Sequence, residues 1–264
     1  MELEEYIQFL TQSDRGASDD STPRRLLKAA IPVELLRALR RMATRLSASF
    51  WRWRAQKLER EFGPLRLHLG CGATRKPGWV NIDLAGANVD LAWDITNPLP
   101  FRDGAVDAIF HEHLLEHLSL TEGLSLVKEC HRLLKEGGVL RVAVPDCKNY
   151  LTAYATGDTL LNDLRPGRPT ALLAASEVFL RHGHRSAYDL ETLTLLFRAA
   201  GFTAVGESSY GVGQIRPSPD SEHRRRESLY VESIKGGRDT VLPRKHIATV
   251  PAERDSREAG RLAS

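Results

Sequence analysis

Hydrophobic residues change spacing repeatedly between residues 65 and 235, and this change predicts an α/β fold. Short apolar runs bounded by turn residues predict strands, and runs with a period near 3.6 predict helices. The predicted strands span residues 65–70, 79–84, 89–94, 106–111, 138–144, 203–209 and 228–234. One helix is expected between the fourth and fifth strands, ending at Gly137-Gly138, and two more near Ala171–Arg181 and over Tyr188–Ala200. Alternating strands and helices are typical of a mostly parallel sheet with helices on both faces.

The two ends of the chain lack this pattern. Residues 1–22 are acidic and polar and are expected to be disordered, as is the polar tail over residues 237–264. Residues 23–62 combine apolar residues at helical spacing with many Lys and Arg, which predicts a basic helical arm before a domain over residues 63–236. Through residues 23–60 the arm fits a protein partner or an anionic membrane surface, although a solvated helical face is the more common role of such a pattern.

Composition limits the class of protein. With 264 residues, 42% hydrophobic and 27% charged, and a net charge of +3, the chain can bury a core and has the balance of a soluble globular protein. Its cysteines, Cys71, Cys130 and Cys147, have no paired spacing, which argues against a disulfide framework or structural zinc. There is no apolar run of about 20 residues and no signal-like start, so we expect a cytoplasmic protein that is at most peripheral to the membrane.

A glycine turn follows the first predicted strand and is the first candidate for a binding site. In Gly70-Cys71-Gly72 the missing side chains would let the backbone approach a ligand closely. The turn is weak support by itself, because the third glycine of the dinucleotide fingerprint is absent and a purely structural turn is an equal alternative.

Acidic residues end the next two predicted strands. Asp83 can accept hydrogen bonds from ribose hydroxyls, and Asp94 can accept from an adenine amino group while Ile95 covers the ring. Each acid taken singly is equally well explained as a turn or cap residue. Three successive strands that end in suitable chemistry favour a nucleoside-binding site.

These residues lie in segments that resemble class I S-adenosylmethionine-dependent methyltransferases. The segments, in order between Leu65 and Lys235, are LHLGCG, PGWVNIDL, LPFRDGAVDAIFHEHLLEHL, ECHRLLKEGGVLRVAVPD and YDLETLTLLFRAAGF. The resemblance implies a Rossmann-like sheet of seven strands, the last one antiparallel. It also implies S-adenosylmethionine as cofactor.

The resemblance further implies roles for single residues. Gly70, Cys71 and Gly72 would border the methionine end of the cofactor, Asp83 the ribose, and Asp94 with Ile95 the adenine, while His111 would line the cofactor and face the substrate. Only residues 73–78 separate the glycine turn from the second strand, too few for a crossover helix. Less helix N-terminus near the cofactor suits a sulfonium cation better than a pyrophosphate, which favours S-adenosylmethionine over NAD.

Several histidines are candidates for metal binding or for a catalytic base. His113 to His117 spells HxxEH, a zinc-protease signature, but no clear third ligand is offered and the same letters fall at the LEH segment of the methyltransferase pattern, so no metal site is expected. A hydroxyl acceptor needs a proton acceptor, and the candidates are His184, His182 and then His111. A surface or structural role is the alternative for each of them. A carboxylate acceptor would need no base.

The expected function is therefore transfer of a methyl group from S-adenosylmethionine to a hydroxyl or carboxyl oxygen of a small molecule or glycan. Members of the resembling branch often act in pathways that tailor cell-surface glycans or small molecules, which is only weak support for the acceptor class. One alternative is a catalytically idle subunit that binds the cofactor and a protein partner. A nucleic-acid methyltransferase is less favoured, because the sequence has no recognition module and no basic groove rich in aromatic residues.

Overall fold

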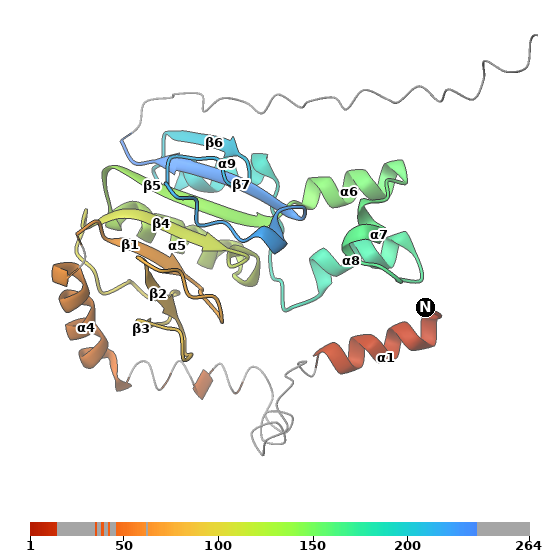
Figure 1. Ribbon diagram of the computed structural model, residues 1–264, viewed down its shortest axis with the longest axis horizontal. Helices are drawn as coiled ribbons and strands as arrows, with labels where there is room; N and C mark the ends of the chain where they lie inside the picture. Colours follow the sequence, from red (N-terminus) through yellow and green to blue (C-terminus); the bar gives the residue numbers. More distant parts are fainter. Residues whose placement is uncertain (15–34, 36–37, 40–41, 43–45, 62, 237–264) are drawn as a thin grey trace, which may run out of the picture.

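A single seven-stranded sheet organises the protein, and the computed structural model describes residues 1–14, 35, 38–39, 42, 46–61 and 63–236. The strand order is β3-β2-β1-β4-β5-β7-β6 (Figure 1). The strands are β1 (Arg66–Leu69), β2 (Val80–Asp83), β3 (Leu91–Ala92), β4 (Val106–Glu112), β5 (Leu134–Pro145), β6 (Ala204–Ser208) and β7 (Ser228–Ile234). Only β7 runs antiparallel to its neighbours. The predicted Rossmann-like sheet of seven mostly parallel strands is confirmed.

The helices connect and flank these strands. They are α1 (Leu3–Asp14), α4 (Ala48–Glu61), α5 (Leu120–Leu133), α6 (Cys147–Thr156), α7 (Leu160–Leu164), α8 (Ala171–Leu180) and α9 (Leu190–Ala199), with 3-10 turns η1 (Leu115–His117) and η2 (Glu222–Arg224). Helix α5 ends at Leu133, before the expected Gly137-Gly138, because Leu134 already pairs with Val106 as the first residue of β5. Helices α6 and α7 were not expected, and with α8 they enclose a small apolar cluster of their own beyond the end of β5 (Figure 1).

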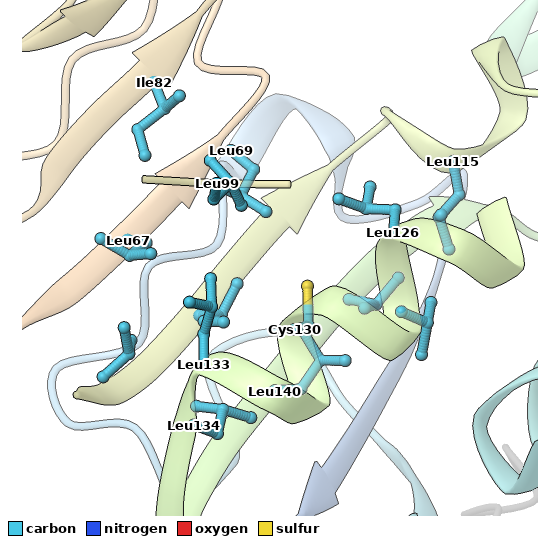
Figure 2. Close-up of a cluster of buried hydrophobic side chains, with 14 of the residues drawn as sticks. Leu67, Leu69, Ile82, Leu99, Leu115, Leu126, Cys130, Leu133, Leu134 and Leu140 are labelled. Carbon is cyan, nitrogen blue, oxygen red and sulfur yellow. The ribbon is translucent and has the colours of Figure 1, made fainter. Parts of the chain in front are cut away.

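The main core lies on one face of the sheet. Alternate strand residues such as Leu67, Ile82 and Leu140 point to this face and pack against Leu126 and Leu133 of α5 (Figure 2). Helices α4 and α9 add side chains to the same cluster. This packing fixes the strand ends that carry the candidate site.

A loop contributes to the opposite face of the sheet. Ile215, from the connection between β6 and β7, packs with Trp79, Ala108 and Phe110 in a separate apolar cluster. The connection between β1 and β2 is made of turns and bends, so the expectation that its crossover helix is reduced to a turn is confirmed.

The N-terminal segment differs from its prediction. Residues 1–22 were expected to be disordered, but Leu3–Asp14 form α1. The phenol of Tyr6 is buried and donates a 2.8 Å hydrogen bond to Oε1 of Glu177 in α8, and the ring of Phe9 lies under two guanidinium groups, of Arg168 and Arg181. The prediction of disorder rested on the polar composition of this segment, whereas the contacts of Tyr6 and Phe9 attach the helix to α8 and the residues beside it.

Much of the predicted basic arm over residues 23–62, and all of the tail over 237–264, lies outside the described residues. Within the arm, α4 carries Ala55 and Leu58 into the core, whereas Phe50 and Trp53 are exposed. Among the helices that the structure describes, none has the length and apolar character needed to cross a bilayer.

Candidate functional site

The carboxyl ends of four neighbouring strands border a cavity of about 710 Å³. It is lined by Gly70, Asp83, Leu84, Trp93, Asp94, Ile95, Thr96, His113, Leu114, His117, Leu118, Glu122 and Arg185. Ligands of open α/β sheets bind in the crevice outside the carboxyl ends of the strands, and this volume is that of a small-molecule site. Gly70, Asp83, Asp94 and Ile95, four of the residues predicted to bind the cofactor, thus meet in one cavity.

The glycine turn leaves β1 in the left-handed backbone region. Gly70 has φ 64° and Gly72 has φ 53°, conformations that favour glycine. A Cβ atom on Gly70 would lie 2.6 Å from Cδ1 of Leu114, so the close approach expected there is to a side chain of the cavity wall. A Cβ atom on Gly72 would meet no atom within 4 Å, so its glycine is explained by backbone conformation alone.

Asp83 ties this turn to the next strand. Its Oδ2 accepts a 2.8 Å hydrogen bond from the Gly72 amide, and its Oδ1 accepts one of 2.7 Å from the Leu84 amide. Each carboxylate oxygen has a second lone pair, so the half-buried side chain can still accept hydrogen bonds from hydroxyls of a ligand in the cavity. The structural role and the predicted ribose-binding role are compatible.

Asp94 forms the wall after β3. Its carboxylate is buried, and Oδ1 accepts hydrogen bonds from the amide and the hydroxyl of Thr96, at 3.1 and 2.7 Å. The carboxylate therefore shapes a turn while it lines the cavity. Trp93 and Ile95 add apolar surface on either side of it, which suits a flat ring with polar edges.

Cys71 and Gly72 do not line the main cavity but border a smaller recess of about 230 Å³. It shares Gly70 and His113 with the main cavity and is otherwise bordered by His68, Cys71, Gly72, Ala73, Thr74, Glu112, His223 and Arg224. Burial, helped by the charge of Asp83, raises the pKa of the Cys71 thiol to about 11, so this thiol is not a nucleophile near neutral pH.

His111 is not at the cavity surface. Its side chain is fully buried on β4, and neither ring nitrogen has a hydrogen-bond partner. Burial lowers the pKa of His111 to about 4, against the opposing charge of Glu116. The structure therefore places a predicted site residue inside the protein, away from solvent and from a substrate.

His184 and His182 lie in the loop between α8 and α9, beside the cavity but outside its lining. The Nδ1 atom of His184 donates a 2.7 Å hydrogen bond to the carbonyl of Val178, and its ring lies edge-on to the ring of His117 at 4.9 Å. His182 is exposed and has φ 61°. Among the histidines of the described chain, His113 and His117 are the ones that line the cavity.

Several cavity residues were not identified from the sequence. His117 is the last residue of the 3-10 turn η1 and lines the cavity. Glu122 and Arg185 also line it and form an ion pair, with 2.6 Å between Nη1 of Arg185 and Oε2 of Glu122. Arg185 comes from a loop far along the chain, and no local pattern pairs it with Glu122. Within the described residues, one group of three side chains has the geometry of a metal site, Glu116, His117 and His184.

Comparisons with known proteins agree with this geometry. Residues 67–142 match the profile of a family described as a methyltransferase domain. The matched range begins in β1 and ends in β5, so it contains the glycine turn and both acids. No curated protein sequence matches the chain significantly.

Solved structures with related chain traces were also found. A SAM-dependent methyltransferase from Archaeoglobus fulgidus has 14% identity and a TM-score of 0.42, over 71% of this chain and 94% of that one. A putative methyltransferase from Haloferax volcanii, solved with a methyltransferase activator, has 16% identity and a TM-score of 0.41, over 72% and 92%. A possible histamine N-methyltransferase from Thermotoga maritima has 16% identity and a TM-score of 0.40, over 74% and 97%.

Proposed function

Because residues 67–142 match a methyltransferase-domain family and the chain resembles class I S-adenosylmethionine-dependent methyltransferases, we propose that it transfers a methyl group from that cofactor to an oxygen atom of a small-molecule or glycan acceptor, in the cavity at the carboxyl ends of β1 to β4. The observation that carries the proposal is that Gly70, Asp83, Asp94 and Ile95 line one cavity. Bound there, the cofactor would supply a methyl group activated by its sulfonium charge.

The chain's own residues suit that cofactor. Asp83 offers lone pairs to ribose hydroxyls, and Asp94 and Ile95 offer a polar edge and an apolar face to the adenine. Gly70 would border the methionine end of the cofactor, and the two carboxylates favour a cationic ligand over a phosphate. Trp93 and Leu118 add apolar surface to the wall, which suits a displacement reaction whose rate depends on positioning and on exclusion of water.

The rest of the cavity wall is polar and suits the acceptor. His113, His117, Glu122 and Arg185 lie there, so an acceptor with hydroxyl or carboxyl groups finds both donors and acceptors of hydrogen bonds. The predicted bases His184, His182 and His111 do not line the cavity, so an acceptor would first meet His117 or His113.

Cofactor binding is tested by calorimetry with S-adenosylmethionine on the full chain. Asp83→Asn should weaken binding about tenfold or more, because a hydrogen bond to a charged group contributes about 1.5–3 kcal/mol. Asp103→Asn is the matched control, since this carboxylate is 80% exposed and remote from the cavity. Equal affinity of the wild type and Asp83→Asn would refute the ribose assignment.

Methyl transfer is tested by supplying S-adenosylmethionine with a labelled methyl group together with a cell extract. We expect label in an oxygen-methylated small molecule or glycan. Tight cofactor binding with no labelled product would instead support the alternative of a catalytically idle subunit, and label in nucleic acid would overturn the acceptor class.

A further inference from the structure

We propose that Glu116, His117 and His184 form a binding site for a divalent transition-metal ion beside the cavity. One ligand atom from each side chain, a carboxylate oxygen and two imidazole nitrogens, lies within 4.8 Å of the other two. Two imidazoles and one carboxylate with a remaining open position are the donor set of catalytic zinc sites. The proposal concerns a site that the proposed methyl transfer does not itself require.

Glu116 gives independent support for a bound cation. Its side chain is 2% exposed, and neither carboxylate oxygen makes a hydrogen bond of good geometry. The nearest basic group is Nδ1 of His113 at 3.3 Å, whose Nε2 already bonds to Ser228 at 2.8 Å. The carboxylate is thus paired with a histidine that is charged only when protonated, and a metal ion at this position would supply a permanent positive charge.

His184 is oriented as a metal ligand would be. A carbonyl oxygen can only accept, so the 2.7 Å contact with Val178 assigns the ring proton of His184 to Nδ1. The Nε2 atom then carries the lone pair that a metal needs. Metal-binding histidines usually donate their other ring nitrogen to a carbonyl or carboxylate in this way.

Backbone hydrogen bonds hold the two ligand segments together. The carbonyl of Glu116 accepts from the amides of Arg185, at 2.7 Å, and Ser186, at 3.2 Å. The Ser186 hydroxyl donates to the carbonyls of Leu115 and Leu118. The site therefore lies on a preformed support, so binding a metal would require little rearrangement.

The ligand set favours Zn²⁺ or Co²⁺ over Mg²⁺, because imidazole nitrogens suit the later transition metals and Mg²⁺ prefers oxygen ligands. Since His117 also lines the cavity, a metal ion bound by it would lie close to the part of the cavity that suits the acceptor. The expected acceptor then offers an oxygen to the metal, for example a hydroxyl beside a carboxylate or a second hydroxyl. This last step rests on the proposed function.

The test uses the full chain, stripped with a chelator and titrated with Co²⁺ and with Zn²⁺. We expect one equivalent to bind, with the visible absorption of low-coordinate Co²⁺, and with a rise in melting temperature when metal is added. His184→Asn keeps a side-chain donor for the Val178 carbonyl but removes the ligand nitrogen, so it should weaken binding at least tenfold, as should Glu116→Gln.

His182→Asn is the matched control, because the His182 ring lies 5.9 Å from the ring of His184 but supplies none of the three ligand atoms, and Asn tolerates its left-handed backbone. It should bind Co²⁺ like the wild type. Circular dichroism and melting without metal verify that each variant folds. Failure of the wild type to bind an equivalent, or undiminished binding by His184→Asn, would overturn the site. Calorimetry with S-adenosylmethionine on the same samples tests separately whether the cavity binds the proposed cofactor.

Discussion

The buried His111 makes the pH dependence of stability predictable. Replacing it by leucine, which has a similar volume, removes a titratable group whose two nitrogens are buried without partners. In the wild type the imidazole must stay neutral in the folded state, because burial lowers its pKa from 6.5 to about 4. The variant has no such constraint.

Proton linkage gives the direction and the magnitude of the change in the free energy of unfolding with pH. Between pH 6.5 and about 4 the unfolded chain holds more protons at this position than the folded chain, so acid lowers the free energy of unfolding. Below both pKa values of His111, the total loss in the free energy of unfolding is about 3 kcal/mol. Lowering the pH from about 7.5 to about 5 accounts for about 2 kcal/mol of this loss. In a domain of this size that step is worth about 4–8 °C of melting temperature.

Urea unfolding at about pH 7.5 and about pH 5 measures the effect. His111→Leu should lose about 2 kcal/mol less than the wild type over this step. His68, also buried with a pKa lowered to about 4, is present in both proteins and cancels in the difference. Equal pH-dependent losses in the two proteins would contradict the assignment of His111 as a buried neutral group. Retained methyl transfer by the variant would in addition exclude it as the general base.

Three further changes test other parts of the structure. Arg141→Ala should lower the free energy of unfolding by about 3–5 kcal/mol in urea titrations, because Arg141 is fully buried between Asp220 and Glu232; a loss below about 1 kcal/mol would contradict this role. Tyr6→Phe should increase hydrogen exchange in α1 by removing the bond to Glu177, and unchanged exchange would argue against this docking. Asp94→Ala should weaken binding of S-adenosylmethionine about tenfold, measured by calorimetry against the Asp103→Asn control, and full affinity would refute its adenine role.

The strands could be predicted from the sequence because their signal is local. All seven predicted strands overlap observed ones, because a short apolar run such as Val142–Val144 can be recognised from a few consecutive residues. The positions of Gly70, Asp83 and Asp94 followed from the same signal, because the residue after a parallel strand lies at the edge where ligands bind.

The acceptor side of the cavity could not be predicted, because it depends on contacts between distant segments. His184 and Arg185 reach η1 and α5 only through the fold, so the closeness of His184 to Glu116 and His117 was invisible in the sequence. The burial of His111, in contrast, could have been predicted from the sequence. Strand residues alternate between faces, and His111 shares the face of Ile109, which belongs to the core. This alternation indicates burial.

The two sides of the cavity are thus held by different parts of the protein. Asp83 and Asp94 lie on strands and turns packed by the main core, whereas the loop with His184 is attached to Glu116 at one end and follows α8 at the other. Glu177 of α8 binds both Tyr6 of α1 and Arg181 at the start of this loop. Loosening α1 should therefore disturb the acceptor side more than the donor side, and a Tyr6→Phe variant with unchanged cofactor affinity but altered acceptor use would be the mark of that separation.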